Sequence, residues 1–134
     1  ALKNCIAMKK LRIDLFVISG EHNSIVKYRC NKLGLMCYQG IDNKFQFYKE
    51  NFEGFNSDKE KSYVYLGNDL NDIKLIRNAY FSFCPKDSPE FIKKNVDFIT
   101  EAKGGQGFVR EVIEYLFKDA NISEEEVIDF IEKQ

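Results

Sequence analysis

Short apolar runs alternate along this chain with segments whose apolar residues recur at helical spacing. The apolar runs predict strands at residues 13–19, 35–38, 62–66, 80–84 and 97–100. Helical spacing and end signals predict helices at residues 23–33, 43–52, 69–77, 89–94, 108–117 and 124–132, with a helix-like start at 1–10 and a polar loop at 54–61. Short strands that alternate with helices indicate an α/β fold with a mainly parallel sheet covered on both faces.

Length and composition fit one domain over residues 1–134. The chain is 44% hydrophobic and 14% aromatic, which is enough for a core, and it has no repeat, low-complexity tract or linker. None of the apolar runs approaches the roughly 20 residues that a membrane span needs, so no membrane is expected as a partner. The first ten residues do not resemble a signal peptide, and we expect a cytoplasmic protein.

The charge is balanced overall but uneven along the chain. Twenty basic against 21 acidic residues give no general drive toward nucleic acid. Residues 111–134 carry two basic and eight acidic groups, which is most simply a solvated helix face. The four cysteines (Cys5, Cys30, Cys37 and Cys84) form no CxxC pair, and the single histidine, His22, is expected at the surface. These cysteines are therefore expected to be reduced and structural, with Cys84 buried in its apolar run.

Candidate chemistry is expected where strands end, because loops at the carboxyl ends of parallel strands form the sites of such folds. The strongest signal is Gly67-Asn68-Asp69-Leu70-Asn71-Asp72, which follows a strand and opens a helix. Oxygen side chains grouped in this way suit Mg²⁺, which takes one or two carboxylates besides water and phosphate. The alternative is a helix cap, since Asn and Asp favour that position.

Three further segments could hold an anion, and each has an ordinary structural alternative. Ser19 and Gly20 end a strand, where a hydroxyl and free N–H groups can hold a phosphate oxygen, or simply form a turn. Lys44 follows the next strand and could neutralise phosphate, or only solvate a surface. The glycines at 104–107 precede a helix that carries Arg110, which suits an anion but also a tight turn.

Taken in order, six segments resemble the haloacid dehalogenase (HAD) superfamily of phosphohydrolases. They are VISG at 17–20, RCNKLGL at 29–35, QGIDNK at 39–44, YLGNDLND at 65–72, CPKDSP at 84–89 and GGQGFVRE at 104–111. The closest resemblance is to the 3-deoxy-D-manno-octulosonate 8-phosphate phosphatase group, which includes the C-terminal domain of acylneuraminate cytidylyltransferases. The resemblance implies a HAD-like Rossmannoid three-layer sandwich of the type without a large cap domain, and a homotetramer.

The resemblance also assigns site residues. Ser19, with Gly20 beside it, matches the motif that hydrogen-bonds the transferring phosphoryl group, and Lys44 matches the cation that stabilises the phosphoaspartyl intermediate. Arg110 matches an arginine near the sugar-acid substrate. The metal assignment covers the residues of the fourth motif that would anchor Mg²⁺, namely Asn68, Asp69 and Asp72.

The sequence departs from the family pattern at two points. Asn68 stands where the phosphatases usually carry Asp, as in the sialic-acid-related branch. The first motif, an Asp-x-Asp pair whose first Asp is the nucleophile and whose second is the general acid/base, does not occur in these 134 residues. In the family this pair lies on a central strand, so we expect that upstream residues are missing from the sequence.

Two functions follow from the resemblance. The first is Mg²⁺-dependent hydrolysis of a sugar-acid phosphate, either the octulosonate 8-phosphate or a nonulosonate (sialic acid) 9-phosphate, through an aspartyl-phosphate. The alternative is a non-catalytic domain that assembles a CMP-acylneuraminate synthetase (an acylneuraminate cytidylyltransferase) into a tetramer, which Asn68 and the absent first motif favour. A response-regulator-like or nucleotide-binding domain is disfavoured, because no glycine-rich phosphate loop follows the first strand.

Overall fold

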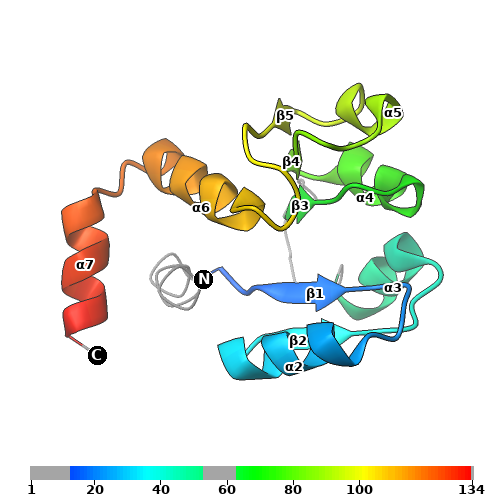
Figure 1. Cartoon of the computed structure of the whole chain (residues 1–134), viewed down its shortest axis with the longest axis horizontal. Coiled ribbons are helices and arrows are strands. Elements are labelled where there is room, and N and C mark those ends of the chain that lie inside the picture. The colour runs from blue at the N-terminus through cyan, green and yellow to red at the C-terminus, as the bar shows by residue number, and fades with distance from the viewer. Residues whose placement is uncertain (1–12, 53–62, 134) are drawn as a thin grey trace. The chain divides into compact units, whose positions relative to one another are not determined.

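The computed structural model describes residues 13–52 and 63–133 (Figure 1). The predicted helix at 1–10, the predicted loop at 54–61 and Cys5 lie outside these residues. By their internal contacts, the described residues divide into two compact units. The first unit comprises residues up to 40 together with 109 onward, and the second comprises residues 41–108.

The first unit contains a two-stranded parallel sheet. β1 (Phe16–Ile18) pairs with β2 (Met36–Tyr38), and Val17 stands opposite Cys37. The connecting helix α2 (Ser24–Leu33) begins at Asn23, whose side chain accepts hydrogen bonds from two backbone N–H groups of the first turn. The helix ends at Gly34, where a φ of 68° turns the chain into β2. Both ends were predicted from the sequence.

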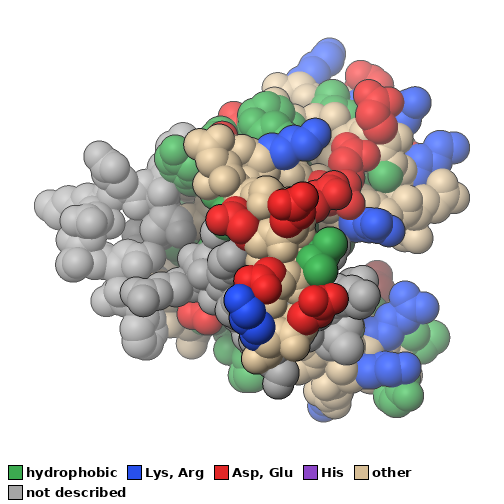
Figure 2. Space-filling view, turned by 90° about the vertical axis from the view of Figure 1, so that its left-hand side faces the viewer, with side chains coloured by type: hydrophobic (Ala, Val, Ile, Leu, Met, Phe, Trp, Pro, Cys, Tyr) green, Lys and Arg blue, Asp and Glu red, His purple; other side chains and the backbone are tan. Residues whose placement is uncertain are grey.

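Two helices complete the first unit. α6 (Phe108–Asp119) buries Val112 and Ile113, and α7 (Glu124–Glu132) begins at the predicted capping box of Ser123 and Glu126. The acidic residues of α7 are exposed, and Figure 2 shows acidic side chains gathered on the face where α7 is turned to the viewer. The prediction of a solvated acidic helix face is confirmed.

The second unit contains a three-stranded parallel sheet in the order β3-β4-β5. These strands are Val64–Leu66, Phe81–Cys84 and Phe98–Ile99. Their helices are α3 (Lys44–Asn51), the 3₁₀ turn η2 (Leu70–Asp72), α4 (Ile73–Asn78) and α5 (Glu90–Lys93). The core includes Ile76, Ile92 and Cys84, so the expected burial of this thiol is confirmed.

The predicted α/β class with parallel strands is confirmed, with two local differences. The helix predicted at 69–77 divides into η2 and α4, because Asp69 and Asp72 form a reciprocal cap that tightens the first turn. The predicted strand at 13–19 is reduced to β1, whose three residues are those that pair with β2. No helix among residues 13–52 and 63–133 is both long and apolar enough to cross a membrane.

Candidate functional site

The loop after β3 passes so close to the side chains of Tyr65 and Asp72 that only glycine fits at position 67. Gly67 donates its N–H to the carbonyl of Phe83, at 3.1 Å, which extends the pairing of β3 with β4. A Cβ atom at this position would stand 2.6 Å from Cε1 of Tyr65 and 2.7 Å from Oδ2 of Asp72. The absent side chain therefore lets the loop fold directly over the Asp72 carboxylate.

Asp72 is the acceptor around which the site is built. Its Oδ1 accepts a hydrogen bond from Lys44 Nζ at 2.6 Å and from the Tyr65 hydroxyl at 2.8 Å. Its Oδ2 accepts the backbone N–H groups of Asn68 and Asp69, at 3.1 and 3.0 Å. Four donors satisfy this buried carboxylate, so that its charge is compensated although Asp72 is only 3% exposed.

Lys44 reaches Asp72 from the first turn of α3. The helix begins at Asn43, whose side chain accepts the N–H of Gln46 at 3.0 Å. The Lys44 and Asp72 side chains are 12% and 4% exposed, so solvent screens their attraction far less than at an open surface. The ion pair fixes the Lys44 ammonium beside the loop that follows β3. The structure thus brings together two of the predicted site residues.

Tyr65 is a member of this cluster that the sequence analysis did not single out. Burial, followed by the charge and hydrogen bond of Asp72, raises the pKa of Tyr65 far above its usual value. The hydroxyl therefore stays protonated through the neutral range and keeps donating to Asp72. A buried tyrosine needs a partner for its hydroxyl, and Tyr65 stands two residues before Gly67 on β3, which is a signal that could have found it.

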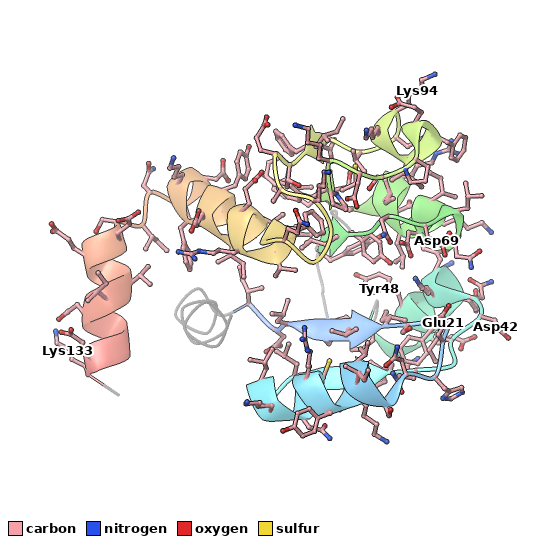
Figure 3. The ribbon with its side chains drawn as sticks, in the orientation of Figure 1. Glu21, Asp42, Tyr48, Asp69, Lys94 and Lys133 are labelled. Atoms are coloured by element: carbon pink, nitrogen blue, oxygen red, sulfur yellow. The ribbon has the colours of Figure 1, made fainter. Side chains whose placement is uncertain are left out.

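Asn68 and Asp69 lie on the exposed side of the same loop, and Figure 3 labels Asp69 there. Asp69 Oδ1 accepts the N–H of Leu70 at 2.6 Å, as a helix cap does. Among residues 13–52 and 63–133, no group of three or more His, Cys, Asp or Glu side chains is arranged to hold a metal ion. A cation at this loop would depend on oxygens of Asn68 and Asp69, with water and substrate oxygens completing its shell.

The carboxyl ends of β1 and β2 form a second candidate edge, in the first unit. The Ser19 N–H donates to the carbonyl of Tyr38 at 2.8 Å, which continues the pairing of the two strands. The Ser19 Oγ accepts the N–H of Glu21 at 3.2 Å across Gly20. The hydroxyl proton is then available to donate, as binding of a phosphoryl oxygen requires.

His22 lies over the end of β2, against Gly40. A Cβ atom at position 40 would stand 2.4 Å from His22 Nε2, and Gly40 has a φ of 68°. His22 is exposed, as expected from the sequence, but the structure also places it at the strand ends next to the turn that begins at Ser19.

Replacing Gly40 by alanine should destabilise the first unit more than the same change at Gly34. Both glycines have a φ of 68°, which costs a residue with a side chain roughly 1–2 kcal/mol, but only Gly40 meets a neighbour. Urea unfolding of both variants measures the difference. In a His22→Ala background the excess at Gly40 should disappear; an equal loss at both positions in every background would contradict the contact.

Comparisons with known proteins find relatives in both sequence and fold. The chain is 30% identical over 105 residues to the 3-deoxy-D-manno-octulosonate 8-phosphate phosphatase of Salmonella typhi, covering 78% of this chain and 55% of that protein. The same enzyme from Yersinia pestis superposes with a TM-score of 0.79 at 25% identity, over 88% of this chain and 64% of that one. The Moraxella catarrhalis enzyme, in complex with magnesium, phosphate and the sugar acid KDO, superposes with a TM-score of 0.80 at 29% identity, over 97% and 72%.

The chain is a homologue of the 3-deoxy-D-manno-octulosonate 8-phosphate phosphatases and has their HAD-like fold. It spans about half the length of the curated relatives that it matches. No family model matches it. The relatives named above do not bear on a cytidylyltransferase or on a tetramer, and both stay predictions.

Two further parts of the phosphatase resemblance, Arg110 and the glycine segment at 104–107, contact carboxylates of the chain itself. Arg110 extends from α6 in the first unit and pairs with Glu114 of the same helix, Nε to Oε1 at 3.0 Å, with 74% of its side chain exposed. In the second unit, the Gly104 N–H donates to Asp87 Oδ1 at 2.8 Å, which holds the pKa of that carboxyl below its usual range. A carboxylate of the chain itself thus occupies one N–H of the glycine segment, while positive φ angles at Gly105 and Gly107 favour the tight-turn alternative.

Proposed function

We propose that the full-length protein containing this chain is a Mg²⁺-dependent phosphohydrolase that acts on a sugar-acid phosphate, with 3-deoxy-D-manno-octulosonate 8-phosphate as the first substrate to test. The observation that carries the proposal is the Lys44 ammonium, held at 2.6 Å by the buried Asp72 carboxylate beside an exposed Asn68–Asp69 loop. Homology to phosphatases of this substrate supports it.

Lys44 supplies the positive charge in this proposal. A cation that is already oriented stabilises charge developing on phosphoryl oxygens without reorganising during the reaction. Asp72 is the positioning residue, because it holds Lys44 from one oxygen and shapes the Asn68–Asp69 backbone from the other. Direct coordination of a metal by Asp72 would have to replace at least one of its four hydrogen bonds.

Asn68 and Asp69 could supply the protein ligands of a Mg²⁺ ion. One carboxylate and one amide oxygen, with water and phosphate, match the ligand set that Mg²⁺ takes in phosphoryl-transfer enzymes. When bound, the ion would offset phosphoryl charge. The described chain would contribute Asp69 and Asn68 as ligands, and Asp72 would support them from behind, which modifies the initial assignment of all three as ligands.

Ser19 and Gly20 would bind phosphoryl oxygens, and Arg110 would lie near the sugar-acid substrate, as the resemblance implies. The aspartyl nucleophile that the resemblance implies has no Asp-x-Asp counterpart in the 134 residues.

The proposed function is tested by phosphate release from a panel of substrates. Octulosonate 8-phosphate, a nonulosonate 9-phosphate and a neutral sugar phosphate of similar size would be compared at equal concentrations of protein and Mg²⁺. We expect turnover of at least one sugar-acid phosphate and much slower turnover of the neutral sugar. A preference for the neutral sugar phosphate would contradict the substrate class, and no turnover of any would contradict the function.

Replacing Ser19 by alanine should lower kcat about 100-fold, as loss of one hydrogen-bond donor to a developing anion does. The fold should persist, because the structural hydrogen bond to Tyr38 comes from the Ser19 backbone. Ser24→Ala, in the first turn of α2, is the matched control and should leave kcat unchanged. Equal kcat values for the two variants would remove Ser19 from the site.

A further inference from the structure

Two cysteines of the first unit lie at the two ends of one tight connection. Cys30 is in α2, and its carbonyl accepts the N–H of Leu35 at 2.9 Å. Gly34 turns the chain between them, and β2 begins at Met36. Cys37, the next residue of β2, is thereby carried back alongside the end of α2.

The side chains of this pair face each other. Cys30 is the one buried residue of α2, at 5% exposed, whereas Cys37 is partly exposed. Side chains alternate along a strand, and Met36 is 61% exposed, so Cys37 points to the opposite, covered side of β2. Burial, and then a hydrogen bond and charge from Cys37, raise the pKa of Cys30 to about 11. The fold thus places the two thiols on the facing sides of α2 and β2, and neither cysteine is in a disulfide in the structure.

We propose that Cys30 and Cys37 form a reversible disulfide when the protein meets a disulfide oxidant such as oxidised glutathione. The Cys37 thiolate attacks one sulfur of glutathione disulfide, forms a mixed disulfide and releases one glutathione thiolate. The Cys30 thiol then loses its proton and attacks the Cys37 sulfur, releasing the second glutathione. The two protein thiols lose two electrons and two protons in total, and one glutathione disulfide becomes two molecules of glutathione.

The order of the two steps follows from the surroundings of each thiol. Cys37 is partly exposed whereas Cys30 is buried, so Cys37 is the thiol that meets the oxidant first. Cys30 is buried and holds its proton, so closure of the bond is the slower step and accelerates as pH rises toward 11. The bond would join α2 to the strand whose Tyr38 carbonyl supports Ser19.

Cys84 provides an internal comparison. It is fully buried in the core of the second unit, and burial raises its pKa. The same oxidant should therefore leave it unmodified. This pattern separates a reactive pair from general oxidation of every thiol in the chain.

The test is incubation of the full-length protein in glutathione buffers of increasing oxidised fraction, acid quenching, alkylation of free thiols and peptide mapping by mass spectrometry. We expect a Cys30–Cys37 linked species that dithiothreitol reverses, with Cys84 alkylated only after unfolding. Cys30→Ser should trap glutathione on Cys37, whereas Cys37→Ser should leave Cys30 unmodified. Persistence of both thiols in the most oxidising buffer, a stable glutathione adduct on wild-type Cys37, or linkage of either cysteine elsewhere would overturn the proposal. None of these readouts depends on phosphatase activity.

Discussion

Lys44→Met is expected to lower kcat for phosphate release by roughly 100- to 1,000-fold in the full-length protein. The substitution keeps an apolar stem of similar length but removes the ammonium that Asp72 holds at 2.6 Å. Loss of one pre-oriented charged donor to phosphoryl oxygens has an effect of this size on the transition state. The measurement is kcat at saturating substrate and Mg²⁺.

Lys49→Met is the matched control for this change. Lys49 lies on the same helix α3 and is exposed, with its ammonium 5.8 Å from the centre of the Phe45 ring. It should keep kcat near the wild-type value. Urea unfolding of both variants separates lost charge from lost folding. A Lys44→Met protein that is folded and retains full kcat would contradict the assignment of Lys44.

Asp72→Ala is expected to destabilise the second unit by about 3–5 kcal/mol, because it leaves buried donors without their acceptor. The Lys44 ammonium and the Tyr65 hydroxyl would lose Oδ1, and the N–H groups that close the Gly67 loop would lose Oδ2. The measurement is the free energy of unfolding from urea titration of the full-length protein.

Asp69→Ala separates this structural role from metal binding. Asp69 is exposed and caps only the short turn η2, so its loss should cost about 1 kcal/mol. It should nevertheless raise the Mg²⁺ concentration needed for activity. Equal stability losses for Asp69→Ala and Asp72→Ala would refute the distinction between them.

In a Lys44→Met background, Asp72→Asn should cost less stability than in the wild type, since the Lys44 partner of the carboxylate is already gone.

The sequence was sufficient to predict the order of elements and the parallel pairing of the strands. Apolar runs separated by helical spacing located β1 to β5, and Gly34 and Ser123 marked helix ends correctly, because these signals are local. Lys44 and Asp72 were both expected at strand ends, and the structure joins them.

The roles within the Gly67–Asp72 segment could not be predicted from composition alone. Asn68, Asp69 and Asp72 are all oxygen donors, and only the 3₁₀ turn determines that Asp72 points inward while the other two remain exposed. The predicted single helix would have placed them differently. The orientation of Asp72 also depends on a long-range partner, Lys44, which no local pattern contains.

Long-range pairing also accounts for the glycine segment at 104–107. Its composition suits either an anion site or a turn. The Gly104 N–H donates to the carboxylate of Asp87, a residue distant in sequence, and this contact favours the turn. The placement of Cys30 and Cys37 on the facing sides of α2 and β2 also depends on the fold. The sequence marks the turn at Gly34 but does not show which side chains that turn brings to face each other.

The most direct measurement is the initial rate of phosphate release from 3-deoxy-D-manno-octulosonate 8-phosphate by the full-length protein, first with saturating Mg²⁺, then with excess EDTA, then with Mg²⁺ restored. A sugar-acid phosphatase with a Mg²⁺ site at Asn68 and Asp69 should release phosphate in the first condition, stop in the second and recover in the third. Absence of release with Mg²⁺ from this substrate and from the nonulosonate 9-phosphate alike, or an unchanged rate in EDTA, would contradict it.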